Sequence, residues 1–188
     1  MQSETKEILA ELADLLKKRA KQDGVHPSAE IPSLCLYRTS QLGEATHTLY
    51  KPSLCIIAQG TKEVLVGAET FCYDAAHYLL ASVELPVAGR ITEASADTPY
   101  LSLSIDLDPA EIQSLTLDTN IPAALPSGSS RGIAVSRMDT DLLDAVLRLV
   151  RLQEYPRDIP VLAPLILREI LYRLLIGEQE GCLRRMAS

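Results

Sequence analysis

Hydrophobic and polar residues alternate most regularly between Tyr100 and Asp108. The apolar positions are Leu101, Leu103, Ile105 and Leu107, and the polar positions are Ser102, Ser104, Asp106 and Asp108. Successive side chains of a β-strand point to opposite faces of its sheet. The pattern therefore predicts a half-buried strand whose leucines pack on the core.

Seven further stretches of strand length precede this one. They are Leu34–Thr39, His47–Tyr50, Leu54–Gln59, Lys62–Val66, Thr70–Tyr73, His77–Ser82 and Val87–Glu93. Turn-forming residues such as Gln59-Gly60 and Gly67-Ala68 separate them. Many short strands with turn signals between them are typical of an antiparallel sandwich or barrel.

Helical periodicity flanks the strands on both sides. Apolar residues recur every three or four positions over Ser3–Ala20, which predicts an amphipathic helix ending near Gly24. Asp108-Pro109 signals another helix start, and 121–131, rich in proline and serine, reads as a loop. Two helices follow, one capped by Asp139 or Thr140 and one after Asp158, with Pro164 expected in the first turn of the second. The pattern as a whole predicts an α+β fold.

Composition and charge narrow the class of protein. The 188 residues are 47% hydrophobic with a formal net charge of −7, which indicates a globular chain. Lysine and arginine are scattered, whereas a nucleic-acid-binding domain usually has a clustered basic face, so we expect this chain not to hold DNA or RNA itself. The charged N-terminus and the lack of an apolar run of about 20 residues predict a cytoplasmic protein without membrane contact.

Four longer segments carry a resemblance to a known family. They are YKPSLCIIAQGTKEVLVG from Tyr50, YDAAHYLLASVELPVAGRITEAS from Tyr73, PYLSLSIDLDP from Pro99 and DIPVLAPLILREILYRLLIG from Asp158. Together they resemble the N-terminal regulatory domain of AraC-type transcription regulators, and the resemblance extends from about Leu9 to Arg185.

The resemblance implies an organisation in three parts. These are an N-terminal helix over 1–24, a cupin-like effector-binding β-barrel over 30–108 and a helical dimerisation region over 109–188. In such regulators two helix-turn-helix motifs follow and read the DNA. The sequence ends at Ser188, where that module would begin, so we expect DNA contact only through a C-terminal domain outside this chain.

We expect the barrel to bind a small-molecule effector. The candidate ligand-binding residues are Tyr37, His47, Tyr50, Cys55, Ile57, His77, Tyr78 and Glu93. Tyrosines can wall a pocket and offer a hydroxyl, although a buried structural role is the default for each. Cys55 is either a small core residue or a cavity thiol that reacts with an electrophile such as an aldehyde.

A metal or catalytic role finds little support. His47 and His77 lack the His-x-His spacing that many cupin metal sites use, because Leu49 and Leu79 occupy the required positions. Glu93 is either an inward carboxylate that could hold an effector or an exposed rim charge. We therefore expect no metal, no cofactor and no catalytic residue.

The C-terminal helices carry two apolar stripes, which we expect to form a homodimer interface as well as to pack on the barrel. The interface candidates are Leu142, Val146, Leu149, Leu162, Ile166, Ile170 and Leu174. Two other functions stay open. One is a cupin-type enzyme such as an isomerase or oxygenase, and the other is an interaction module whose barrel is filled by side chains.

Overall fold

The computed structural model describes residues 2–119, 132–177, 182–183 and 186. The predicted loop at 121–131 lies outside these residues. The helices are α1 (Gln2–Arg19), α2 (Pro109–Thr119), α3 (Thr140–Leu152) and α4 (Ile159–Ile176). The strands are β1 (Gly24–Pro27), β2 (Leu34–Thr39), β3 (Thr46–Tyr50), β4 (Ser53–Gln59), β5 (Thr61–Val66), β6 (Glu69–Asp74), β7 (His77–Ala81), β8 (Leu85–Glu93), β9 (Tyr100–Asp106) and β10 (Ile133–Arg137).

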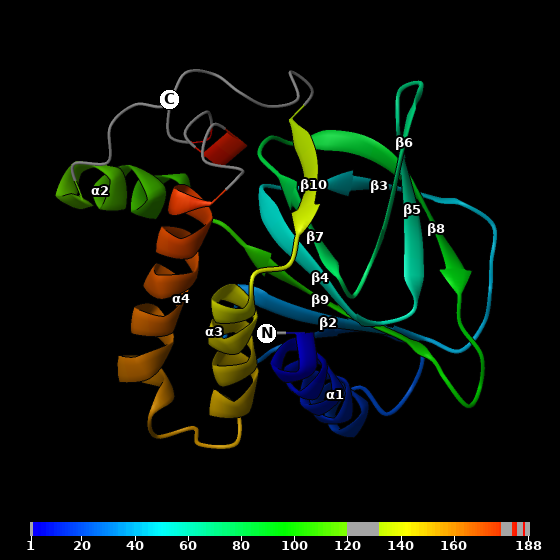
Figure 1. Ribbon diagram of the computed structural model, residues 1–188, viewed down its shortest axis with the longest axis horizontal. Helices are drawn as coiled ribbons and strands as arrows, with labels where there is room; N and C mark the ends of the chain where they lie inside the picture. The colour runs from blue at the N-terminus through cyan, green and yellow to red at the C-terminus, as the bar shows by residue number, and fades with distance from the viewer. Residues whose placement is uncertain (1, 120–131, 178–181, 184–185, 187–188) are drawn as a thin grey trace.

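The strands form two antiparallel sheets that face each other (Figure 1). The larger sheet has the order β1-β2-β9-β4-β7-β10, and the smaller has the order β3-β8-β5-β6. Every strand pair is antiparallel. The α+β class and the antiparallel barrel or sandwich predicted from the alternation are confirmed.

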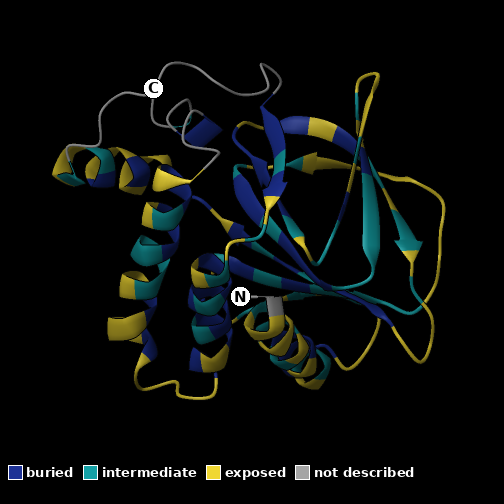
Figure 2. Cartoon of the chain, viewed as in Figure 1, coloured by how far each residue is buried: buried dark blue, intermediate teal, exposed yellow. Residues whose placement is uncertain are grey.

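Helices cover the outer face of the larger sheet, with α1 and α3 side by side, α4 against α3, and α2 against α4 (Figure 1). The main hydrophobic core lies between this face and the helices, and it includes Leu101, Leu103 and Ile105 of β9. A second cluster, which includes Ile57, Val64 and Tyr100, lies between the two sheets. Figure 2 shows buried residues along the layer where sheet and helices meet.

Two strands were not predicted. β1 lies directly after α1 and pairs with β2, and β10 lies in the span expected to be helical and pairs with β7. Both are outermost strands of the larger sheet. They are four and five residues long, too short to show a clear period-two pattern of their own.

The predicted caps hold at two helices. The Asp139 carboxylate accepts hydrogen bonds from the backbone N–H groups of Asp141 and Leu142, and Asp108 accepts one from Ala110. The start of α4 differs from expectation. The helix begins at Ile159, so Pro164 lies inside it, in the second turn and not in the first. Proline has no N–H, so the carbonyl of Pro160 loses its partner within the helix.

The chain passes from the larger to the smaller sheet through Gly60, the single residue between β4 and β5. Its φ is 94°, a left-handed value that residues with a side chain rarely adopt. A Cβ here would lie 2.6 Å from the Glu93 carbonyl oxygen and 3.0 Å from a ring carbon of Tyr100. This corner of the barrel therefore requires glycine.

The expected dimer-interface residues divide into two groups. Five belong to the chain's own core: Leu142, Val146, Leu149, Ile170 and Leu174 are each at most 2% exposed. They cannot meet a partner without opening the helical layer, so the expectation needs correction for these five. Leu162 is 41% exposed and Ile166 is partly buried.

Apolar side chains are nevertheless exposed on the outer side of α4 (Figure 2). We name the set Val161, Leu165, Tyr172 and Ile176 the α4 stripe. The spacings of four, seven and four residues place them on one side of the helix. The interface prediction therefore moves from the buried stripes to this surface.

Candidate functional site

A cavity of about 650 Å³ lies between the two sheets. Strands of the larger sheet supply one wall through β2, β4 and β9, and strands of the smaller sheet supply the other through β3, β5, β6 and β8. The segment 41–44, which connects β2 to β3, lies at its edge. A space of this size falls in the usual range of small-molecule sites.

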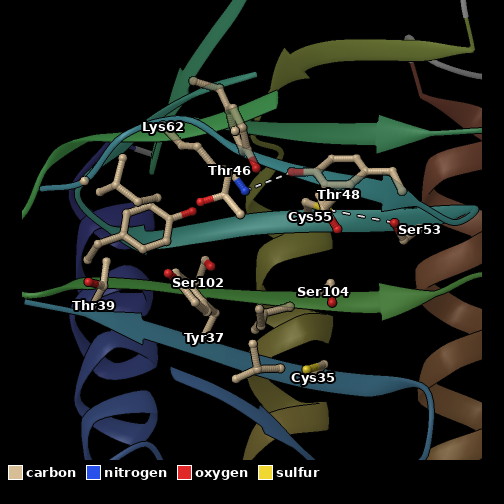
Figure 3. Close-up of a pocket in the computed structure, with 18 of the residues that line it drawn as sticks. Cys35, Tyr37, Thr39, Thr46, Thr48, Ser53, Cys55, Lys62, Ser102 and Ser104 are labelled. Carbon is tan, nitrogen blue, oxygen red and sulfur yellow. Dashed lines mark hydrogen bonds between the residues drawn. The ribbon is translucent and has the colours of Figure 1, made fainter. Parts of the chain in front are cut away.

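In the larger sheet, the pairing register of β2, β9 and β4 places the side chains of one cavity wall in rows across the strands. Ser104 of β9 pairs with Cys35 of β2 on one side and with Cys55 of β4 on the other. The next inward row, two residues along, places Ser102 between Tyr37 and Ile57. Figure 3 shows Ser102, Ser104 and Cys55 facing the cavity. The two serines of the alternating strand thus face the inside of the barrel, whereas Asp106 at its end is exposed.

Lys62 enters the cavity from β5 in the opposite sheet (Figure 3). Its amine donates a hydrogen bond of 2.9 Å to the Tyr50 hydroxyl and lies 5.5 Å from the centre of the Tyr50 ring. Burial lowers the pKa of Lys62, although the nearby Cys55 opposes the shift. Gly89 of β8 makes room for this arm, since a Cβ there would lie 2.9 Å from the Lys62 Cε.

Four tyrosines line the same space: Tyr37, Tyr50, Tyr73 and Tyr100. The rings of Tyr37 and Tyr100 meet edge to face, with centroids 5.9 Å apart. Burial raises the pKa of Tyr50, Tyr73 and Tyr100 well above that of free tyrosine. These hydroxyls therefore stay neutral and can serve a ligand as hydrogen-bond donors or acceptors.

The Cys55 thiol also faces the cavity, with the Ser53 hydroxyl 3.9 Å from its sulfur. Burial raises the pKa of this thiol, which outweighs the opposite effects of Lys62 and Ser53. The thiolate is the nucleophilic form of cysteine, so a raised pKa makes Cys55 a weak nucleophile near neutral pH. The arrangement favours packing or a neutral contact over reaction with an electrophile.

The cavity brings together three of the eight residues expected at the ligand site, namely Tyr37, Tyr50 and Cys55. Ile57 is fully buried between the sheets next to them, although it is not part of the cavity wall. Tyr78 lies on the other side of the larger sheet and is buried in the main core against the helices.

The other three predicted residues lie away from the cavity. His47 is exposed on β3. His77 is paired with the Asp74 carboxylate at 2.8 Å. Glu93 is exposed and accepts a hydrogen bond of 2.8 Å from the Thr61 hydroxyl, which agrees with the rim reading of this carboxylate. Among the residues that the structure describes, no three His, Cys, Asp or Glu side chains gather as a metal site.

Sequence reasoning missed the polar part of the wall, above all Lys62, Ser102 and Ser104. Alternation did separate the serines from the core leucines. The alternation alone predicted that the serine side faces solvent, because alternation does not reveal whether a second sheet covers that side. The sequence signal that Lys62 lines a cavity was weaker, since a lysine in a short strand is usually exposed.

The chain is similar to a known protein family. The family described as AraC-type transcriptional regulator N-terminus matches residues 30–182. The chain belongs to this family. A search of curated protein sequences returns no significant match.

This AraC-type domain resembles solved structures of AraC-like regulators, and the one with a TM-score above 0.5 supports its cupin-like fold. ToxT from Vibrio cholerae strain SCE256, bound to an unsaturated fatty acid, is 7% identical with a TM-score of 0.57, covering 80% of this chain and 55% of that one. ToxT from Vibrio cholerae O395 with (E)-4-(8-methylnaphthalen-1-yl)but-3-enoic acid is 13% identical with a TM-score of 0.48, covering 77% and 53%. The AraC-like activator CuxR is 10% identical with a TM-score of 0.42, covering 86% and 54%.

The AraC-type domain thus spans a little over half the length of each solved structure that it resembles. Within the described residues, none of its helices has the length and apolar character that a membrane crossing needs. The family match identifies the chain as the N-terminal domain of an AraC-type regulator.

Proposed function

We propose that this domain binds a small-molecule effector in its barrel and, as a homodimer, controls how an attached DNA-binding module is presented. The observation that carries the proposal is the cavity of about 650 Å³ between the sheets, walled by tyrosines, hydroxyls and one lysine. A barrel that served only as an interaction module would be filled by side chains. No chemical step is required of the domain.

The position of β9 suggests how ligand binding in the cavity could change the packing of the helices. β9 contributes Ser102 and Ser104 to the cavity and Leu101, Leu103 and Ile105 to the core beneath the helices. A ligand that binds one arrangement of the barrel better than another shifts the balance between the two. The fatty acid in the ToxT structure provides a precedent for small-molecule binding by this fold.

A screen for stabilising compounds tests the proposal. A ligand in 100-fold excess over its Kd stabilises a protein by about 2.7 kcal/mol, or roughly 5–10 °C in melting temperature for a chain of this size. We expect a library of acidic and neutral metabolites to contain such compounds. The Ser102→Phe variant, which places a ring in the cavity, should fold with a similar melting temperature and lose the response.

Two outcomes would contradict this proposal. A melting temperature unmoved by every compound would exclude effector binding over the library tested. A response that survives Ser102→Phe would place the ligand elsewhere on the chain. Circular dichroism of the unliganded variant is the control that the substitution leaves the fold intact.

A further inference from the structure

The cavity contains a partly buried ammonium group that no carboxylate neutralises. Among the described residues, the hydrogen-bond partner of the Lys62 amine is the neutral hydroxyl of Tyr50, 2.9 Å away. The pairs that arginines form with Asp or Glu, such as Arg90 with Glu63 on the outer side of the same strand pair, have no counterpart at Lys62 among the described residues. Burying a charge without a partner is costly, so an unneutralised ammonium needs an explanation.

The fold gives the lysine arm a defined place. Gly89 of β8 leaves the space through which the arm passes, because any Cβ at that position would lie 2.9 Å from the Lys62 Cε. The arm of Lys62 crosses β8 and reaches Tyr50 on β3 of the same sheet, and the hydrogen bond to the Tyr50 hydroxyl fixes the amine at the inner surface of this wall. The amine is therefore oriented before any ligand binds.

The remaining charges of the cavity lie at its rim. Lys51, Glu44 and Asp106 line it as well, but all three are exposed. The Asp106 carboxylate helps to raise the pKa of the Cys35 and Cys55 thiols, but among the described residues it forms no ion pair with Lys62. Lys62 is the partly buried member of these four charged residues. Around it the walls offer neutral hydroxyls, including those of Ser102, Ser104 and Thr48. One fixed positive charge among neutral donors and acceptors fits a ligand with one negative group and further polar groups.

We propose that the effector is a small carboxylic acid whose carboxylate accepts hydrogen bonds from the Lys62 amine and the Tyr50 hydroxyl. This inference rests on the proposed function, since it names the class of effector that the barrel would bind. The ligand supplies the missing counter-charge, and its remaining polar groups meet the serine hydroxyls of β9. In the absence of a ligand, Lys62 makes the domain less stable than an apolar residue would.

The test compares three carboxylates with their uncharged amides. Octanoate, benzoate and gluconate are each titrated against octanamide, benzamide and gluconamide at low salt, with melting temperature and calorimetry as readouts. We expect at least one acid to stabilise the wild-type chain and its amide to have no measurable effect. Lys62→Met should weaken binding of that acid by at least about tenfold, and charge-matched Lys18→Met on α1 should leave it unchanged.

A second readout needs no ligand. If the role of Lys62 is to bind the ligand carboxylate, the unliganded Lys62→Met variant should melt at or above the wild-type temperature, because methionine fills the space without a charge. If the Lys62–Tyr50 bond serves only the fold, the same substitution should lower the melting temperature. A lowered temperature together with unchanged acid binding would overturn the proposal.

The outcomes also separate this inference from the proposed function. Equal binding of an acid and its amide, or binding of amides alone, would reject the acid class and keep effector binding in the barrel. If none of the six compounds changes the melting temperature or gives binding heat, these three kinds of acid would be rejected as effectors. A flat response to the wider library as well would remove effector binding itself.

Discussion

The Cys55 thiol shows how the surroundings of one residue decide its chemistry. It faces the cavity, yet burial raises its pKa, so the protonated form persists to higher pH than in a free cysteine. Cys72, by contrast, is exposed on β6. The reactivity of a buried and of an exposed thiol can therefore be compared within one molecule.

We therefore expect iodoacetamide to modify Cys72 first at pH 7.5 and Cys55 at least about tenfold more slowly. Because the folded pKa of Cys55 is raised, its rate should increase as the pH rises, without levelling off near the pH of a free thiol. Peptide mass spectrometry over time measures both sites in one sample. Faster labelling of Cys55 than of Cys72 would contradict this and revive the electrophile hypothesis.

Site residues could be predicted from the sequence only in part, and the reason lies in the geometry of strands. Tyr37, Tyr50 and Cys55 were expected at the ligand site and do line the cavity. Ser102 and Lys62 were missed because alternation tells which residues share a face but not whether a second sheet covers that face. Tyr78 was misplaced for the same reason, since its strand has an inner and an outer face, both buried.

At the scale of elements, local signals located eight strands to within about two residues. Alternation and turn residues act over short distances, so they leave a trace in the sequence. β1 and β10 leave little trace, because pairing with another strand stabilises them more than local propensity does. The partner of β10, β7, is also distant in the sequence. The packing of α3 and α4 was foreseen as apolar stripes, whereas the ion pair between them, Arg148 of α3 with Glu169 of α4, was not.

The corner between β4 and β5 gives an element-scale prediction. Gly60→Ala should lower the free energy of unfolding by about 2–4 kcal/mol, because the new Cβ meets the Glu93 carbonyl in addition to the cost of a positive φ. Gly67→Ala is the matched control. Gly67 also has a positive φ, 59°, but nothing lies within 4 Å of its added Cβ.

We expect the control to cost about 1–2 kcal/mol, the cost of the left-handed backbone alone. Urea denaturation of both variants and the wild type measures the difference. Equal losses at the two positions would mean that the corner relaxes around the added methyl group. In that case the close approach at Gly60 would not be the reason that this corner requires glycine.

At the scale of the whole molecule, the α4 stripe is the surface on which we expect a second copy of the domain to dock. Val161 and Leu165 are 66% and 60% exposed on the outermost helix of the helical layer. Exposed apolar residues that share one side of a helix often mark a protein–protein contact. The buried residues first considered for this role hold α3 and α4 to the barrel instead.

We expect the wild-type chain to be a dimer and the double variant Val161→Glu with Leu165→Glu to be a monomer, as measured by light scattering at micromolar concentration. Leu65→Glu on β5 is the control, since Leu65 is also exposed, at 43%, but lies on the barrel. A control that also dissociates would point to charge repulsion in general. A wild-type monomer at high micromolar concentration would exclude the docking surface.

The rows of the larger sheet have a consequence for the redox state of the barrel. Cys35 and Cys55 face the same cavity, but Ser104 lies between them in the pairing register. Two strand spacings separate their backbones by about 10 Å, whereas a disulfide requires Cα atoms within about 7 Å. Oxidation therefore cannot lock β2 to β4 while β9 stays in place. The barrel should have the same capacity for its ligand in oxidising and in reducing buffer.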